Sequence, residues 1–537
     1  MEKKLEAADI IAQFERAKSD RSNWDNHWQD VADFVLPSRE FTKVSSRGTQ
    51  RRLKIFNSTA PEAALSLASA LESMLFNTSI RWFSLGTEDE SLSRDFAMRD
   101  WLYDTTTRML SYFDNTNTNF STTLHEIALD LVTFGTGIML LQERDGLLKY
   151  QSRQLANMYL ATSDSDDVTD IFREFEMPAW EVVDMFGDAV SEKVRKQAAD
   201  PRKHDKKVKI IHFIYMRKKR DVFKKDGTNK KWGSMYIEKD AKSILREGGF
   251  DENPYIVSRW SRASEEVYGR SPAMTVLPTI RVVNTMARTM IEASELAVRP
   301  PLMIGAGTVE GPIRTAPGSI LYVRQGTRDY PQPLNSGVRP DMGIKLMQAE
   351  EEKIQQAFFA DRLKLPENDR MTATEIVERR QQGLLAVSPV LSRIYAELLN
   401  PLIERTYKWM KKKNLVKPMP IQGEGARLKI HYVSPMAVSR KASNSQAFMQ
   451  AMSVVTPLVQ VDPNVMQNLD SDGIFRAVML NNNVDPSFLR DEMEVEQSRM
   501  QQAQQEQQQM SMQQAGEGAS AARDAAVAAK ELGLVGQ

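Results

Sequence analysis

The segment PTIRVVNTMARTMIEASELAVRPP, residues 278–301, sets the architecture of this chain because it predicts one long helix with a defined end. Its polar side chains recur every three or four residues and so share one helical face: Arg281, Thr285, Arg288, Glu292 and Glu295. The prolines of Arg-Pro-Pro at 299–301 then end the helix, because proline has no backbone N–H to donate. We predict an amphipathic helix over residues 278–298, beginning near Pro278.

A second helix is predicted at about 342–362, and it pairs with the first to form a hairpin. The segment between them, 299–340, is rich in proline and glycine and too short for a further domain. The two helices can therefore lie antiparallel, with a small module at their tip. A polar-striped helix is ordinarily a surface helix of one domain, whereas here we expect an extended hairpin.

A mixed-charge loop at 363–371 follows the second helix. It carries cations, carboxylates and an amide together: Lys364, Glu367, Asn368, Asp369 and Arg370. Thr372 and Glu375 then form a Thr-x-x-Glu capping box, in which each side chain bonds to a backbone N–H at the start of a helix. We predict that this helix is broken or bent at Pro389 and Pro401 and ends at Lys-Lys-Lys-Asn, 411–414.

The rest of the chain predicts a mainly helical α+β protein. Residues 1–40 have apolar side chains at helical spacing, and a later helix ends at Gly135. Asp145-Gly146 is a strong β-hairpin signal, and residues 147–260 read mostly as short antiparallel strands with one helix near 179–198. Short helices are predicted over 440–480, and a helix beginning at 485–487 passes into a Gln/Met-rich segment.

The composition excludes several classes of protein. The 537 residues include no cysteine, which rules out disulfide scaffolds and thiolate metal sites. Lys+Arg and Asp+Glu are both 71, and this neutrality argues against tight nonspecific DNA binding while permitting DNA that slides past. The N-terminus lacks a signal-like apolar region, and the most apolar stretch, Leu131–Leu141, is too short to span a bilayer. We expect a soluble protein with no membrane insertion.

Motifs for catalysis or cofactor binding are missing from the sequence. There is no P-loop, and the Gly-Thr-Gly at 135–137 fits a helix end better than a dinucleotide fingerprint. No two of the five histidines have metal-ligand spacing, and the acidic run at 163–167 fails the EF-hand pattern. We therefore predict no catalytic residues, no metal and no cofactor, and a protein that is not an enzyme.

Two stretches in combination resemble the head-to-tail connector, or portal, proteins of short-tailed, podovirus-type bacteriophages. In NPYIVSRWSRASEEVYGRSPAMTVLPTI, residues 253–280, the pattern PYIV.RW followed by E.YGRSPA leads into the first channel helix of that family. In RMTATEIVERRQQ, residues 370–382, MTATEI..R opens its long helix after the loop. RSNWDNHWQDVADFVLPS near the N-terminus and VSPMAVSRKA at 433–442 are also similar, so the resemblance covers nearly the whole chain.

The resemblance implies a portal fold made of consecutive segments. These are a wing at 1–270, a first stem helix at 271–298, a clip at 299–340, a second stem helix at 341–362, a tunnel loop at 363–371, a long broken wing helix at 372–415, a crown at 416–485, and a C-terminal barrel helix with a flexible tail at 486–537.

The resemblance also implies which residues meet other molecules. The tunnel loop and stem would line a DNA channel through Lys364, Glu367, Asn368, Asp369, Arg370, Arg281, Arg288, Lys345 and Lys353. Mixed charges at this place would touch phosphates without gripping them, because neutralising many phosphates would bind DNA too tightly for sliding. The clip would offer Arg314, Arg324 and Arg328 as a docking surface.

The expected assembly is a homo-oligomeric ring, usually of twelve copies, at one capsid vertex. Its partners would be double-stranded DNA, the terminase large subunit, tail adaptor proteins, and the major capsid and scaffolding proteins. The protein would reside in the virion, and in the host cytoplasm during assembly. Two alternatives stay open at this point: a DNA-processing or packaging enzyme subunit, and a capsid–tail adaptor that never contacts DNA.

Overall fold

The computed structural model describes most of the first 420 residues and several shorter pieces beyond them. The described residues are 6–42, 54–76, 81–89, 92, 95–162, 168–218, 220–221, 223–224, 226–306, 308–310, 313, 322–323, 326, 332–333, 340–360, 387–420, 427–432, 472–475, 479, 495–505, 507, 523–525 and 527. The chain divides into two compact units, one formed by 1–82 with 108–416 and the other by 83–107 with 417–537.

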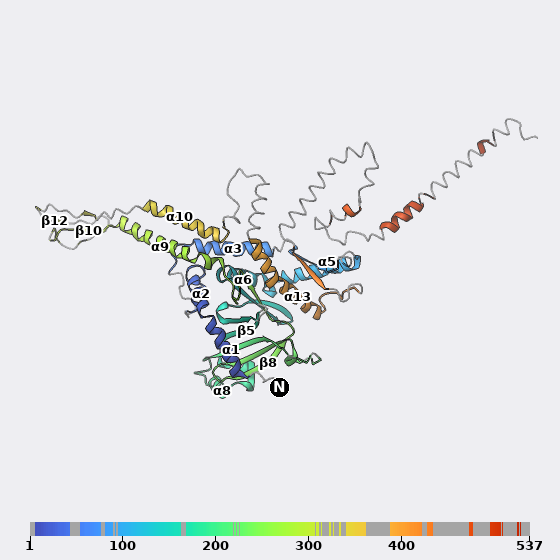
Figure 1. The fold of residues 1–537 in the computed structure, drawn as a ribbon, viewed down its shortest axis with the longest axis horizontal. Helices are drawn as coiled ribbons and strands as arrows, with labels where there is room; N and C mark the ends of the chain where they lie inside the picture. Colours follow the sequence, from blue (N-terminus) through green and yellow to red (C-terminus); the bar gives the residue numbers. More distant parts are fainter. Residues whose placement is uncertain are drawn as a thin grey trace, which may run out of the picture. The chain divides into compact units, whose positions relative to one another are not determined.

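Two antiparallel sheets form the centre of the first unit (Figure 1). The three-stranded sheet has the order β3–β2–β9, with β3 Leu147–Ser152, β2 Thr136–Arg144 and β9 Tyr255–Arg259. The five-stranded sheet has the order β4–β5–β6–β7–β8, with β4 Met158–Thr162, β5 Val168–Pro178, β6 Lys207–Met216, β7 Trp232–Glu238 and β8 Ser243–Phe250.

Helices cover both sheets and supply part of the core. They are α1 Ala7–Asp20, α2 Ser22–Phe34, α3 Thr59–Leu75, α6 Phe120–Phe134, α7 Ala179–Phe186 and α8 Glu192–Ala199. Ile10 and Phe14 of α1 are fully buried in one cluster with Phe172 and Phe213 of the five-stranded sheet. Burying one such side chain contributes about 1.5–3 kcal/mol, so α1 is held on the sheet by packing.

Local signals in this unit behave as predicted in two places and not in a third. Gly135 ends α6 in the left-handed conformation at φ 78°, and Asp145-Gly146 turns β2 into β3 with both φ angles positive. The single helix predicted near 179–198 is wrong, because α7 and α8 are separate helices. Gly187, at φ 56°, stops α7, and a 3-10 turn at Gly187–Ala189 precedes α8.

The hairpin predicted from the opening segment consists of α9 Pro272–Val298 and α10 Pro340–Ala357, which lie side by side (Figure 1). The prediction that the first helix begins near Pro278 was six residues too late. Ser271 caps the helix, Pro272 occupies its first turn, and Pro278 lies inside it. The predicted end of the second helix at 362 was too late, because Phe359 turns to φ 56°.

Short antiparallel strand pairs lie at the far end of the hairpin, where the sequence predicts a small module (Figure 1). They are β10 Leu302–Met303 with β13 Gln332–Pro333, and β11 Val309–Glu310 with β12 Tyr322–Val323.

The helix predicted from 372 is described from residue 387 onward. At Pro401, where a break or a bend is predicted, the chain stays helical: a π-helical turn at Tyr395–Leu399 leads directly into α13 Asn400–Lys412. The wider turn accommodates Pro401. In a regular α-helix, proline has no N–H to donate to the carbonyl four residues earlier, and its ring collides with that carbonyl. Asn414, at φ 55°, ends the run near the predicted Lys-Lys-Lys-Asn.

The second unit joins two distant parts of the chain through one strand pair. β1 Phe83–Thr87 is antiparallel to β14 Leu428–Tyr432. Residues of α5 Phe96–Phe113 brace this pair, since Thr106 Oγ1 accepts from the Leu85 N–H and Trp101 Nε1 donates to the Lys417 carbonyl. Residues 83–107, expected within a 1–270 segment, thus group with the later part of the chain. Most of the helices predicted over 440–480 lie outside the described residues.

Candidate functional site

The residues of the YGRSPA motif build the junction from which the hairpin projects. The Tyr268 hydroxyl, buried at 4% exposure, accepts from the Leu160 N–H at 3.0 Å. Burial raises the pKa of Tyr268 to about 12, so the phenol stays neutral. Ser271 Oγ accepts from the Met274 N–H at 3.0 Å and caps the first turn of α9. The motif therefore starts α9 and fixes it to the sheets.

Two glycines, Gly135 and Gly269, meet at this junction with their backbones in direct contact. A Cβ on Gly269 would lie 2.1 Å from the Gly135 carbonyl oxygen, and a Cβ on Gly135 would lie 2.3 Å from the Gly269 carbonyl oxygen. No other residue type can occupy either position without moving backbone, because both obstacles are main-chain atoms.

The last carbonyl groups of α6, which a helix end leaves without partners, are satisfied by this junction. Ser271 Oγ donates to the Thr133 carbonyl at 2.7 Å, Trp28 Nε1 to the Phe134 carbonyl at 3.1 Å, and the Trp260 N–H to the Gly135 carbonyl at 2.9 Å. One helix end thus binds α2, the end of β9 and the start of α9 together. The hairpin is anchored through hydrogen bonds that are almost wholly buried.

A buried ion pair ties the PYIV.RW motif to the π-helical turn. Arg259 donates from Nε and Nη2 to the carboxylate of Glu397, with the shortest contact at 2.9 Å, and its backbone N–H also donates to Glu397 at 2.8 Å. The Arg259 side chain is 9% exposed and the Glu397 side chain 20%. Such a two-pronged contact is geometrically specific and stronger than a surface ion pair.

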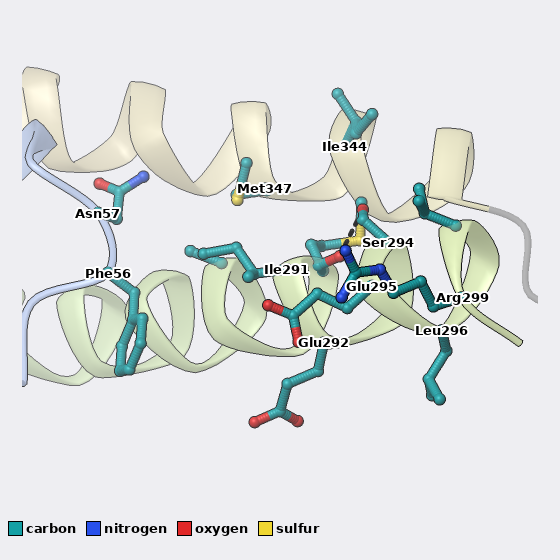
Figure 2. A pocket seen from close by; sticks show the side chains of 13 residues that line it. Phe56, Asn57, Ile291, Glu292, Ser294, Glu295, Leu296, Arg299, Ile344 and Met347 are labelled. Carbon is teal, nitrogen blue, oxygen red and sulfur yellow. Dashed lines mark hydrogen bonds between the residues drawn. The ribbon is translucent and has the colours of Figure 1, made fainter. Parts of the chain in front are cut away.

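A groove of about 1190 Å³ runs along the hairpin between α9, α10 and the loop at Phe56 and Asn57. Figure 2 shows Ile291 and Met347 between the two helices, with Glu292 and Leu296 on the side of α9 away from α10. Apolar side chains here are well exposed, including Ile291 at 48% and Val298 at 80%. An apolar surface of this kind marks an interaction site in a folded protein.

The loop at Phe56 and Asn57 is fastened to both helices of the hairpin. Asn284 of α9 accepts from the Phe56 N–H at 2.7 Å and donates to the Lys54 carbonyl at 2.8 Å. Asn57 donates to Glu351 of α10 at 2.6 Å. The base of the groove is therefore held by three hydrogen bonds that involve side chains.

The predicted channel cations on the hairpin are all exposed, but three of the four have an acidic partner. Arg281 pairs with Asp30 at 2.7 Å, Arg288 with Glu292 at 2.8 Å, and Lys353 with Glu350 at 2.5 Å. Lys345 forms no ion pair with any other residue that the structure describes. The polar stripe of α9 is thus partly neutralised within the chain.

Arg281 lies in a small charged cluster where α2 faces α9. His27, on α2, is half-buried, and its pKa is lowered chiefly by that burial and further by Arg270 and Arg281, against the opposing effect of Asp30. The imidazole is therefore neutral at ordinary pH, and the Arg281–Asp30 pair carries the local charge.

The remaining predicted site residues lie outside the described residues. They are the tunnel-loop residues Lys364, Glu367, Asn368, Asp369 and Arg370, the capping residues Thr372 and Glu375, and the clip arginines Arg314, Arg324 and Arg328. In the part of the chain that is described, no cluster of three or more His, Cys, Asp or Glu side chains is placed to hold a metal. Nor does any described helix have the length and apolarity needed to cross a bilayer.

The anchor residues were not among those predicted from the sequence, although the motifs that contain them were. PYIV.RW and E.YGRSPA served only as family patterns, with no role for Arg259, Gly269 or Ser271. Ser271-Pro272 is a helix-start signal that could have been read directly. The partners Gly135 and Glu397 have no local signal that links them to the motifs.

Comparison with known proteins gives consistent matches over this architecture. A family model described as bacteriophage head to tail connecting protein matches residues 7–489. The probable portal protein of Bordetella phage BPP-1 is 28% identical over 510 residues, covering 92% of this chain and 90% of that protein. The portal protein of Salmonella phage epsilon15 is 29% identical over 507 residues, with 92% and 90% covered.

Among solved structures, a chain of "Virion of native gene transfer agent (GTA) particle" aligns with a TM-score of 0.35 at 12% identity, covering 74% of this chain and 86% of that one. The family match includes both sheets, the hairpin and its anchor, and it confirms the resemblance seen in residues 253–280 and 370–382. The chain belongs to the family of bacteriophage head to tail connecting proteins.

Proposed function

We propose that this chain is a portal subunit that assembles into a ring, usually of twelve copies, at one vertex of a phage capsid. DNA enters the capsid through the ring, driven by a terminase, and later leaves through it, and tail proteins attach to the same ring. The protein acts as a structural channel without catalysis, in the virion and during assembly in the host cytoplasm. The family match over residues 7–489 carries this proposal.

The hairpin groove supports a ring, because a single copy leaves its apolar side chains in water. Leaving such area exposed costs about 25 cal/mol per Å² relative to burial. A neighbouring copy in a closed ring would cover α9 and α10 with its own hairpin. The portal relatives do not favour the alternatives of a packaging enzyme or an adaptor.

The ring can be tested by placing a charge in the groove. In Ile291→Asp, the new carboxylate would be buried between copies without a partner, so we expect purified protein to shift from rings toward monomers at micromolar concentration. Trp180→Asp is the matched control, since Trp180 is 48% exposed on α7, away from the hairpin, and rings should persist. Electron micrographs and native mass spectrometry report the outcome. A stable monomer of the unmodified chain would contradict the proposal.

The DNA channel is a separate part of the proposal, and it rests on the cations predicted along the hairpin and tunnel loop. Charge reversal at Lys345, or at Lys364 together with Arg370, should leave rings intact and lower the amount of packaged DNA severalfold. The loss should depend on salt, because exposed charges are screened over about 8–10 Å at ordinary ionic strength.

Lys196→Glu is the control for the channel experiment. Lys196 is an exposed lysine on α8, paired with Glu192, and lies away from the hairpin. Measuring ring yield and packaged DNA on the same preparations separates assembly from DNA handling. Normal packaging in all the hairpin and loop reversals would rule out these residues as DNA contacts.

A further inference from the structure

A second cleft, unrelated to the hairpin, lies between the two sheets of the first unit. Its volume is about 850 Å³, and residues of α6, β2, β3, β5, β6 and β7 line it. Three arginines line the cleft: Arg144, which is exposed at the end of β2, and the half-buried Arg153 and Arg173. The two half-buried ones approach from different sheets, since Arg153 directly follows β3 and Arg173 lies in the middle of β5. None of its lining residues belongs to the hairpin or to the predicted tunnel loop.

The strand register places one arginine in a row of aromatic and polar side chains. Arg173, His212 and Tyr236 are paired across β5, β6 and β7, so they lie side by side on one face of the sheet. His212 is 5% exposed; its ring stacks on Tyr236 with centroids 4.1 Å apart, and its Nε2 is 2.9 Å from Ser234 Oγ. Arg173 therefore borders the cleft beside a buried, stacked imidazole and phenol ring.

Among the residues that the structure describes, neither Arg153 nor Arg173 forms an ion pair. Arg153 donates from Nη2 to the amide oxygen of Gln151 at 2.6 Å, and the Arg173 guanidinium lies 4.4 Å from the Phe175 ring centroid. The carboxylates that line the cleft, Glu126, Glu176 and Glu181, form no ion pair with either arginine, and Glu176 is paired with Lys207 instead. Two half-buried guanidinium groups therefore lie near each other with no described carboxylate to neutralise them.

The titration behaviour of the cleft agrees with an uncompensated positive potential. Burial lowers the pKa of Arg153, and the charge of Arg173 lowers it further. Burial lowers the pKa of His212 to about 3, with Arg173 and Arg153 acting in the same direction. His212 is thus neutral and adds no charge, while Arg153 stays charged because the intrinsic pKa of a guanidinium is so high.

We propose that this cleft binds a compact oxyanion, a phosphate or carboxylate group, through the guanidinium groups of Arg153 and Arg173. A planar guanidinium offers two parallel donors to such a group, and the low-polarity walls of a cleft strengthen the contact. Tyr236 and Tyr255 line the same cleft, and the Tyr255 hydroxyl lies 3.4 Å from His212 Nδ1 and bonds to the Arg173 side chain. The site would accept an anionic small molecule or an acidic group presented by another protein.

The test measures binding of inorganic phosphate and of glutarate to the full-length protein, with sodium chloride matched for ionic strength. Isothermal titration calorimetry should detect binding of one or both probes, and the melting temperature should rise with the probe. Phosphate alone binding would identify a phosphate-type ligand, and glutarate alone a carboxylate. Binding of neither probe above the chloride background would overturn the proposal.

Variants assign the binding to the two arginines. Arg173→Gln and Arg153→Gln should each weaken binding about tenfold or more, the size expected for losing a hydrogen bond to a charged group. Arg246→Gln is the matched control, because Arg246 is the exposed β8 partner of Tyr236 and does not line the cleft. It should bind like the unmodified protein.

Using two arginine variants keeps the test decisive even if one of the variant proteins does not fold. If one of them fails to fold, the other decides the outcome, since the residues lie on different sheets. Unchanged affinity in the folded variants, or equal loss in Arg246→Gln, would show that the anion binds elsewhere or only through general surface charge, and either result would overturn the site.

Discussion

Gly269→Ala is expected to lower the free energy of unfolding by about 3 kcal/mol, the upper part of the range for overpacking a well-packed site. The added methyl group would lie 2.1 Å from the Gly135 carbonyl oxygen and 3.0 Å from the Arg259 side chain. The first obstacle is main chain, fixed by the hydrogen bond that the Trp260 N–H donates to it. The clash can be relieved only by moving the end of α6 away from the start of α9.

Other glycines of the first unit provide graded controls for this prediction. Gly248→Ala should be almost neutral, because nothing lies within 4 Å of the added carbon and the φ angle is ordinary. Gly146→Ala has equal space but a φ of +76°, so it should cost only about 1 kcal/mol. Gly135→Ala combines a φ of +78° with the clash and should be at least as damaging as Gly269→Ala.

Denaturant unfolding of the four variants, followed by circular dichroism, tests the order. The order expected from most to least stable is Gly248→Ala, Gly146→Ala, then the two junction variants. A Gly269→Ala protein as stable as Gly248→Ala would mean that the backbone contact between the glycines does not hold the junction. We also expect the junction variants to yield fewer rings, because the hairpin projects from this point.

Glu397→Gln is expected to cost about 3 kcal/mol, because it leaves Arg259 buried without a counter-charge. The Arg259 side chain is 9% exposed and cannot reach water to recover its hydration. The amide of glutamine can accept hydrogen bonds from the guanidinium, but it carries no charge. The π-helical turn that holds residue 397 would then lose its tie to β9.

A double variant separates the cost of an unpaired charge from the value of the pair. Arg259→Met with Glu397→Leu removes both charges and should regain much of the lost stability, as apolar replacements of buried ion pairs do elsewhere. Glu292→Gln is the control, since its pair with Arg288 is 57–62% exposed and should contribute about 0.5 kcal/mol or less. If Glu397→Gln were as mild as Glu292→Gln in denaturant unfolding, the buried pair would not be an anchor.

Sequence reasoning succeeded where the signal is local. The helix over 278–298 follows from apolar and polar side chains at helical spacing, and Asp145-Gly146 follows from the positive φ angles that this turn requires. The hairpin follows from the short segment between two helices. The short motifs in residues 253–280 and 370–382 indicate the family, and the family match over residues 7–489 confirms it.

The predictions from sequence were wrong where two local signals compete. Pro278 predicts a helix start, yet Ser271 and Pro272 supply a better one, and the longer helix tolerates the internal proline. The segment near 179–198 has helical composition throughout, and only the backbone at Gly187 divides it into two helices. A break or a bend is predicted at Pro401, and the chain is not broken there, since a π-helical turn leads directly into the next helix.

The contacts that hold the candidate sites together are the ones that no local pattern could reveal. Arg259 and Glu397 are 138 residues apart, and the Gly269 N–H reaches Thr136 Oγ1 across 133 residues. Arg153 and Arg173 become a charged pair only because two sheets pack with those side chains toward one cleft. The periodicity of apolar residues indicates which face of a helix or strand is buried. It does not indicate which distant element covers that face, because the partner is decided by how all the elements pack together.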